Sequence, residues 1–297
     1  MKKFMTLLGI LFSLGEVLAS DTMSIYVIKP KFRISWNSPS SLLFKTALNS
    51  IGGDYAPIGH FAVELKCSNV NQLSINHVMT GMERVDKKQS QKIVLKEKLG
   101  LGSLFYSFEG RLVSAAQTKF EIEAARKDKR LKKMTVSLSP ENCQRGMEFI
   151  ESWIQNGSYS VYGGGKNTLQ GEGAGCADFA NTLFKVTTNY DLPPSWIVRR
   201  KISTSLIGGK EKKINFLKLL FRENWVKDQE DYLIYETADT NQAYDWIEAR
   251  VGAREEYHYQ EVMMKKELLK LEGAPIELSY QYGINHNPED IWGSIQY

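Results

Sequence analysis

Apolar and polar positions follow strand or helix periods in several stretches of the chain. β-Branched and aromatic residues dominate residues 23–36, which predicts a strand that Pro30 restricts to a sheet edge or interrupts. Two strand-like runs at 59–67 and 72–82, separated by polar residues, predict a hairpin. Further strands are expected at 118–126 and 132–139, with the basic run 127–133 as a solvated hairpin tip or, alternatively, a contact for an anionic polymer.

Helical spacing is clearest in the middle of the chain. A Ser-Pro start at Ser38 predicts a helix of about three turns before Gly52. A second Ser-Pro start at Ser139 opens a helix that runs to Gly157, and apolar residues at intervals of three and four predict another helix over 176–186.

The last third alternates predicted helices at 215–226 and 240–252 with strands at 231–238 and 275–283. The sequence has no repeats or low-complexity linkers. It therefore predicts one α+β domain over residues 20–297, with its core at about 55–190 and a C-terminal elaboration at about 191–297.

Residues 1–19 have the pattern of a secretory signal peptide: a Lys-Lys start, an apolar stretch and a small-residue end that fits cleavage after Ala19. No later stretch reaches the ~18 consecutive apolar residues of a membrane span. We therefore expect an exported protein, periplasmic or secreted, without an integral membrane segment. The net charge of +4 gives no reason to expect a nucleic-acid partner, and export argues against one.

The chain contains three cysteines, Cys67, Cys143 and Cys176. In an oxidising compartment an odd cysteine either pairs between chains or stays free. The arrangement we favour bridges Cys67 to Cys143 and leaves Cys176 as a thiol; the alternative leaves Cys67 and Cys143 as unpaired buried thiols.

Cys176 follows a glycine-rich loop and begins a predicted helix. A helix N-terminus favours a thiolate, and a neighbouring imidazolium lowers a thiol pKa further. Gly175 and its small neighbours would leave the sulfur accessible to a substrate backbone. The alternative is that Cys176 is a small buried apolar residue, the commoner role of a lone cysteine.

His60 begins a predicted strand directly after Gly59, where its ring could project toward a facing helix. His258 and His286 lie in polar surroundings typical of exposed residues. No HExxH or paired-cysteine pattern indicates a metal site, and the glycine-rich loop lacks the Walker and dinucleotide spacings, so we expect no cofactor.

A strand that opens with Gly59-His60 and a later Gly-Cys-Ala-Asp-Phe-Ala helix start at 175–180 resemble the circularly permuted papain-like hydrolases. This group includes the permuted NlpC-type cell-wall peptidases and relatives of lecithin:retinol acyltransferase. The resemblance covers about residues 55–190. It implies an antiparallel sheet packed on a helix that carries the cysteine at its N-terminus, with Cys176 as nucleophile and His60 as general base and acid.

The group's third residue is a polar side chain that orients the histidine, usually from the next strand. The resemblance points to His77 for this role, with Asn76 as an alternative on the opposite face. Glu64 shares a face with His60 but lies too far along the strand for a direct hydrogen bond without a twist or bulge.

Papain also carries a glutamine six positions before its cysteine, where the amide helps to build the oxyanion hole. Gln170 stands in that position here, and with the backbone N–H of Cys176 it is a candidate donor. Tyr162 and Asn167 could line the pocket or pack the loop.

The sequence therefore predicts an exported cysteine hydrolase that cleaves an amide bond, most simply in a peptidoglycan peptide, through a Cys-His acyl-enzyme. The first alternative is a lipid acyl hydrolase or acyltransferase that uses the same two residues, which an apolar groove beside Cys176 would favour. The second is an exported binding protein without catalysis, in which Cys176 is buried or bridged and His60 is out of reach.

Overall fold

The computed structural model describes residues 21–51, 56–68, 76–86, 88–209 and 212–259. The expected signal peptide and the expected strand at 275–283 lie outside these residues. Within them, no helix combines the length and the apolar character that crossing a membrane requires.

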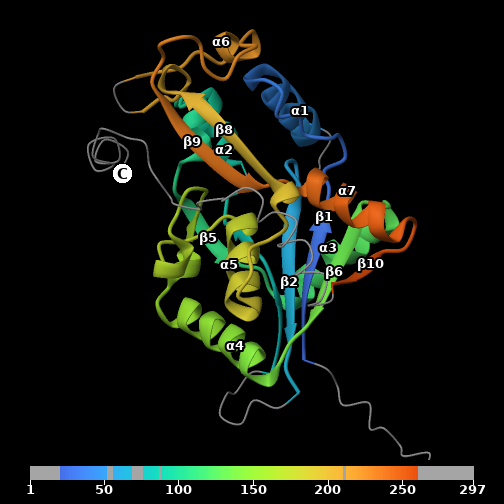
Figure 1. The fold of residues 1–297 in the computed structure, drawn as a ribbon. Coiled ribbons are helices and arrows are strands. Elements are labelled where there is room, and N and C mark those ends of the chain that lie inside the picture. The colour runs from blue at the N-terminus through green and yellow to red at the C-terminus, as the bar shows by residue number, and fades with distance from the viewer. Residues whose placement is uncertain (1–20, 52–55, 69–75, 87, 210–211, 260–297) are drawn as a thin grey trace, which may run out of the picture.

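A five-stranded sheet forms the centre of the molecule (Figure 1). Its strand order is β10-β6-β1-β2-β3, with bounds Glu256–Tyr259, Leu131–Ser137, Thr22–Ile28, His60–Lys66 and His77–Thr80. Neighbouring strands pair antiparallel except that β10 pairs parallel with β6. The fold is thus α+β with a mixed sheet, where the sequence predicted an antiparallel one, and β1 and β10 lie outside the predicted core of 55–190.

Alternate side chains of the strands face two different layers. Ile25 and Val27 of β1 join the main core with side chains of α4 (Pro140–Gln155), α5 (Cys176–Thr188) and α7 (Thr240–Val251). Tyr26 and Ile28 face the other side, where α3 (Ala115–Lys127) packs Ile122 against them. The site described below therefore has a sheet with a helix layer on each face as its frame.

Two small sheets complete the strands. β4 (Met82–Arg84), β5 (Phe108–Leu112) and β7 (Val161–Tyr162) form one, and β8 (Ile197–Ser203) with β9 (Tyr232–Ala238) forms the other. The remaining helices are α1 (Pro39–Ile51), α2 (Gln89–Leu95), α6 (Phe216–Leu220) and five short 3₁₀ turns: η1 (Leu101–Leu104), η2 (Ser158–Ser160), η3 (Thr168–Gln170), η4 (Pro194–Trp196) and η5 (Thr204–Leu206).

The predicted strand at 118–126 is wrong, because these residues belong to helix α3. Ser114 caps this helix by accepting a hydrogen bond from the Gln117 N–H, and Ile122 and Ala125 are buried at a helical interval of three. The basic run 127–133 is consequently not a hairpin tip. It joins α3 to β6, and Lys132 in β6 is buried, with its Nζ donating to the carbonyls of Gly252 and Arg254 at 2.7 and 2.9 Å.

The helices expected at 139–157, 176–186 and 240–252 are present as α4, α5 and α7. The helix expected at 215–226 is shorter, ending as α6 at Leu220. The expected disulfide is confirmed: Cys67, just after β2, is bonded to Cys143 in the first turn of α4, and Cys176 is free and buried.

Candidate functional site

The glycine-rich loop brings the chain to the N-terminus of α5 in a conformation that only glycine accepts easily. Gly173 has a φ of 109°, and a Cβ there would lie 2.5 Å from the carbonyl oxygen of Val161. The Ala174 N–H donates to that same carbonyl at 3.1 Å. Gly175 then acts as the N-cap and Cys176 is the first residue of a 13-residue helix, so its sulfur lies at the positive end of the helix dipole.

The side chains of Cys176 and His60 lie within interaction range, and each shifts the pKa of the other. His60 is the first residue of β2, and its Nε2 atom is buried without a hydrogen-bond partner among the described residues. The imidazole packs against Gly81, where a Cβ would come within 2.9 Å of Nε2. A glycine on the neighbouring segment thus leaves the space that the ring occupies.

The contact favours the ionised pair. Burial raises the pKa of the Cys176 thiol, but the hydrogen bond and charge of His60, the Phe61 N–H and the Tyr162 hydroxyl outweigh it and lower that pKa overall. Burial lowers the pKa of His60, while Cys176, Glu121 and Glu83 outweigh it and raise that pKa overall. Thiolate and imidazolium therefore stabilise each other.

Tyr162 is part of this site and does more than pack the loop. Its hydroxyl donates to the sulfur of Cys176 at 3.9 Å. Burial raises the pKa of Tyr162 well above its ordinary value, so the hydroxyl keeps its proton and remains a donor.

Two buried carboxylates lie near His60 that the sequence analysis did not identify. Val63 pairs with Thr80, and the chain then runs through Gly81, against which the His60 ring packs, to Glu83 in β4. The Gln117 amide of α3 joins Glu83 to Glu121 with bonds of 3.2 and 3.1 Å, and the Arg111 guanidinium donates to Glu83 at 2.6 Å. Gln117 and Glu121 are four residues apart, so their side chains are neighbours if residues 115–127 form a helix. A strand was predicted at 118–126, so this spacing could not be used.

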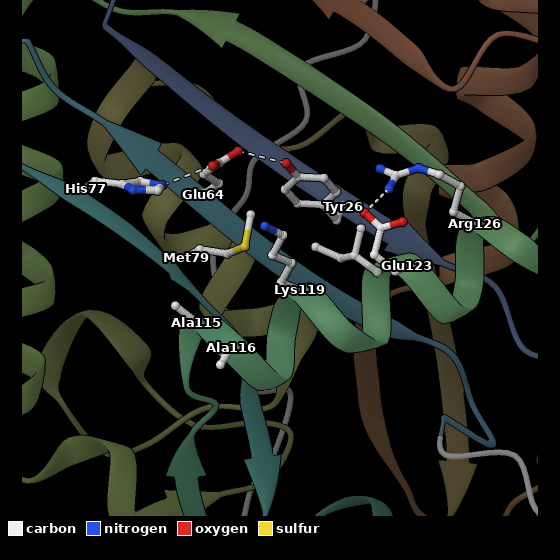
Figure 2. A pocket seen from close by; sticks show the side chains of 10 residues that line it. Tyr26, Glu64, His77, Met79, Ala115, Ala116, Lys119, Glu123 and Arg126 are labelled. Atoms are coloured by element: carbon white, nitrogen blue, oxygen red, sulfur yellow. Dashed lines mark hydrogen bonds and ion pairs between the residues drawn. The ribbon is translucent and has the colours of Figure 1, made fainter.

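The predicted third residue, His77, does not orient His60. It pairs with Lys66 at the opposite end of β2, six residues along the strand from His60. Its Nε2 lies 3.0 Å from Oε1 of Glu64, and the Tyr26 hydroxyl donates to Oε2 of Glu64 at 2.7 Å (Figure 2). Both alternatives also fail: Glu64 is engaged in this separate network, and Asn76 is exposed just before β3.

The Tyr26–Glu64–His77 chain borders a cavity of about 400 Å³ between α3 and strands β1 to β3. Tyr26 belongs to the apolar layer beneath α3, whereas Cys176 belongs to the main core on the other face of the sheet. This cavity is therefore separate from the Cys176 site.

The structure does not bring Gln170 and Asn167 to the sulfur. Gln170 ends η3 with an exposed side chain, and neither residue contacts Cys176 within the described part of the chain. The Asn167 N–H donates to Oε2 of Glu172 at 2.9 Å and its carbonyl accepts the Gln170 N–H at 3.0 Å. The backbone of Asn167 therefore holds the loop together while its side chain is exposed, and the predicted papain-like role of Gln170 has no support in its position.

Asp178 and Tyr235 border the site on the side of β9. Asp178 lies in the first turn of α5 and accepts the Gly175 N–H, while burial raises its pKa to about 7. Tyr235 interacts electrostatically with both Asp178 and Cys176, and its ring stacks on Trp36 with centroids 5.8 Å apart. Tyr235 thus connects the electrostatic surroundings of the thiol to the ring of Trp36.

Among the described residues, no group of three or more His, Cys, Asp and Glu side chains could hold a metal ion. Comparison with protein-family models, curated proteins and solved structures finds no match for this chain. The functional conclusion therefore depends on the geometry of the site alone.

Proposed function

We propose that this protein is an exported cysteine hydrolase of circularly permuted papain-like architecture that cleaves an amide bond. The observation that carries the proposal is the contact between Cys176 at the first turn of α5 and His60 at the start of β2. The histidine precedes the cysteine in the chain, as in the permuted group. The lowered pKa of the thiol is what a nucleophile at neutral pH requires.

The reaction follows from the ionised pair. The thiolate of Cys176 attacks the amide carbonyl carbon, a C–S bond forms, and the carbonyl electrons move to oxygen. The imidazolium of His60 then donates its proton to the amide nitrogen, the C–N bond breaks and the amine leaves. His60 next takes a proton from water, whose oxygen attacks the thioester, and collapse of that intermediate releases the acid and restores the thiolate.

We assign stabilisation of the developing oxyanion to the Cys176 N–H and the Tyr162 hydroxyl. The first N–H groups of a helix have no intrahelical partner, and the Cys176 N–H interacts with the Tyr162 hydroxyl, so the two proposed donors lie together at the start of α5. Tyr162 remains protonated and already donates to the sulfur.

The third catalytic position is assigned to the bridged pair Glu83 and Glu121. Both carboxylates act on His60 by raising its pKa, and Glu83 follows two residues after Gly81, against which the His60 ring packs. They are positioning residues, because they act on the imidazole and not on the substrate.

A peptide amide of peptidoglycan is the substrate class we propose first. The Cys67–Cys143 disulfide is expected in an oxidising compartment such as the periplasm, where such peptides occur. This agrees with the signal-peptide pattern of residues 1–19.

One observation favours a lipid acyl substrate as the second candidate. The Tyr162 hydroxyl contacts the thiol, and Tyr235, which interacts electrostatically with Cys176, stacks on Trp36; aromatic rings in this direction would suit an acyl chain. The non-catalytic alternative is weakened, because Cys176 is buried but unbridged and His60 is within reach.

The test uses the chain from Ser20 with peptidoglycan stem peptides and, in parallel, with short-chain and long-chain acyl esters. We expect amide cleavage and a thioester adduct on Cys176, measured by mass spectrometry. Cys176→Ala and His60→Ala should each lower kcat by about a hundredfold or more.

His258→Ala is the matched control, since this exposed histidine lies in β10 at the far edge of the sheet. Cleavage of esters without any peptide hydrolysis would transfer the assignment to the lipid candidate. Absence of any adduct on Cys176 with both substrate classes would contradict the hydrolase.

A further inference from the structure

Helices α1 and α6 lie side by side at the end of the molecule farthest from α4 (Figure 1). The Ser40 N–H donates to the Arg222 carbonyl at 3.1 Å, which joins the start of α1 to the segment just after α6. Leu43 of α1 packs with buried Leu219 of α6 in a shared apolar cluster. The two helices therefore present one joint outer face.

That outer face is apolar. Phe44, Leu48 and Ile51 follow one another at intervals of four and three along α1. Leu217 of α6 is followed four residues later by Phe221, the C-cap of that helix. Phe44 is 55% exposed and Phe221 is 82% exposed, and Ile51 and Leu217 are also exposed.

The joint between the helices brings the two stripes together. The backbone hydrogen bond connects Ser40 to Arg222. Phe44 lies one turn after Ser40, and Phe221 directly precedes Arg222. Among the described residues Leu48 is half-buried, whereas Phe44, Ile51, Leu217 and Phe221 remain exposed. Large exposed apolar patches of this kind mark interaction surfaces in soluble domains.

The charges on helices α1 and α6 have one sign. Neither α1 nor α6 contains an Asp or Glu. Lys45 adjoins Phe44, Lys218 adjoins Leu217, and Lys212 and Lys213 precede α6. The first acidic residue after α6 is Glu223, and the nearby Arg222 is paired with Glu230.

We propose that the α1–α6 face, defined by Phe44, Leu48, Ile51, Leu217 and Phe221 with its flanking lysines, docks on an anionic lipid bilayer. Apolar side chains rimmed by lysines are the pattern of helices that lie in a bilayer interface. The apolar side chains enter the boundary between headgroups and acyl chains, and the lysines contact anionic headgroups. This inference stands independently of the proposed hydrolase.

The test is sedimentation with vesicles, using the chain from Ser20 so that the apolar residues 1–19 cannot bind lipid themselves. One set of vesicles is phosphatidylcholine alone and the other is an equal mixture with phosphatidylglycerol. We expect binding to the mixed vesicles, weakened by salt, and little binding to phosphatidylcholine alone.

Phe44→Ser combined with Phe221→Ser should weaken this binding by at least about tenfold. Lys45→Gln combined with Lys218→Gln should weaken it and reduce its salt dependence. Phe120→Ser is the matched control, because Phe120 is 72% exposed on α3, which belongs to a different layer, and its loss should leave binding unchanged. Circular dichroism checks that each variant is folded.

Failure of the wild-type chain to bind the mixed vesicles at low salt would overturn the proposal. An equal loss in Phe120→Ser would do the same. A concentration-dependent dimer that the Phe44/Phe221 variant dissociates, without vesicle binding, would instead identify this face as a contact between two copies of the chain.

Discussion

At the residue scale, the candidate site combines a thiol, an imidazole and a phenol that lie close together although they are far apart in the sequence. Cys176 and His60 could be chosen from the sequence, because a cysteine at a helix start and a histidine at a strand start have a chemical reason to be there. The role of Tyr162 could not, since nothing in its neighbourhood fixes where its hydroxyl points. Its contact with the sulfur depends on how β7 lies against the loop.

The third residue shows why residue-level prediction failed. Whether His77 can orient His60 depends on the register between β2 and β3. The sequence predicts the two strands but not the register between them. The actual pairing places His77 opposite Lys66 at the far end of β2 and ends at Thr80, three residues before Glu83.

Glu83→Gln and Glu121→Gln should each lower the pKa of His60, because each variant removes a negative charge that favours the imidazolium. A less stable imidazolium also favours the thiolate less, so the pKa of Cys176 should rise. We expect the pH profile of Cys176 alkylation to shift upward, and the double variant to shift further than either single one. NMR titration of the His60 ring measures the first effect directly.

Glu64→Gln is the control, because Glu64 is a buried carboxylate on the same strand but bonds to Tyr26 and His77. An unchanged His60 titration in Glu83→Gln and Glu121→Gln would show that these carboxylates serve only to hold α3 and β4 in place.

At the element scale, local signals were sufficient where capping and periodicity agreed. α4 has its Ser139 cap, Pro140 in the first turn and buried Met147 and Ile150, and it forms as expected. In 118–126 the periodicities conflicted: Phe120, Ile122 and Ala124 alternate as in a strand, whereas Ile122 and Ala125 are the positions that the sheet buries. Packing of Ile122 and Ala125 against the sheet stabilises the helix, and in the helix Phe120 points to solvent.

The disulfide should be a stabilising link between elements and separate from the chemistry. It connects the end of β2 to α4 across 76 residues, and closing a loop of that length stabilises a fold by about 4 kcal/mol in the chain-entropy estimate. We expect urea unfolding of the Cys67→Ser/Cys143→Ser variant to show a loss of that order. The pH midpoint of Cys176 alkylation should stay where it is in the wild type.

Reduction of the wild-type chain serves as the matched comparison, since it opens the same link without changing the sequence. Because reduction also frees the thiols of Cys67 and Cys143, alkylation is then followed at Cys176 itself by peptide mass spectrometry. A shift of the alkylation midpoint on reduction would mean that the link also positions the thiol, which would contradict the separation of the two roles.

At the scale of the whole molecule, the main core draws on residues from Met23 to Tyr259. The core predicted at 55–190 was therefore too narrow. β10 reaches β6 from the other end of the described chain, and no local pattern specifies a parallel partner more than a hundred residues away. The α+β class followed from the mixture of periods along the chain, whereas the strand order depends on contacts between distant segments.

The central claim is the ionised Cys176–His60 pair, and the measurement that tests it most directly is the rate of Cys176 alkylation by iodoacetamide from pH 4 to 9. Cys176 is the one free thiol, so the reaction reports it alone. Because the folded-state pKa of the thiol is lowered from 9.0, the thiolate should persist as the pH falls, and alkylation should remain fast well below that value. His60→Ala should move the midpoint upward and slow the reaction at neutral pH by about tenfold or more. A wild-type profile that rises only near pH 9 and is unchanged in His60→Ala would contradict the account.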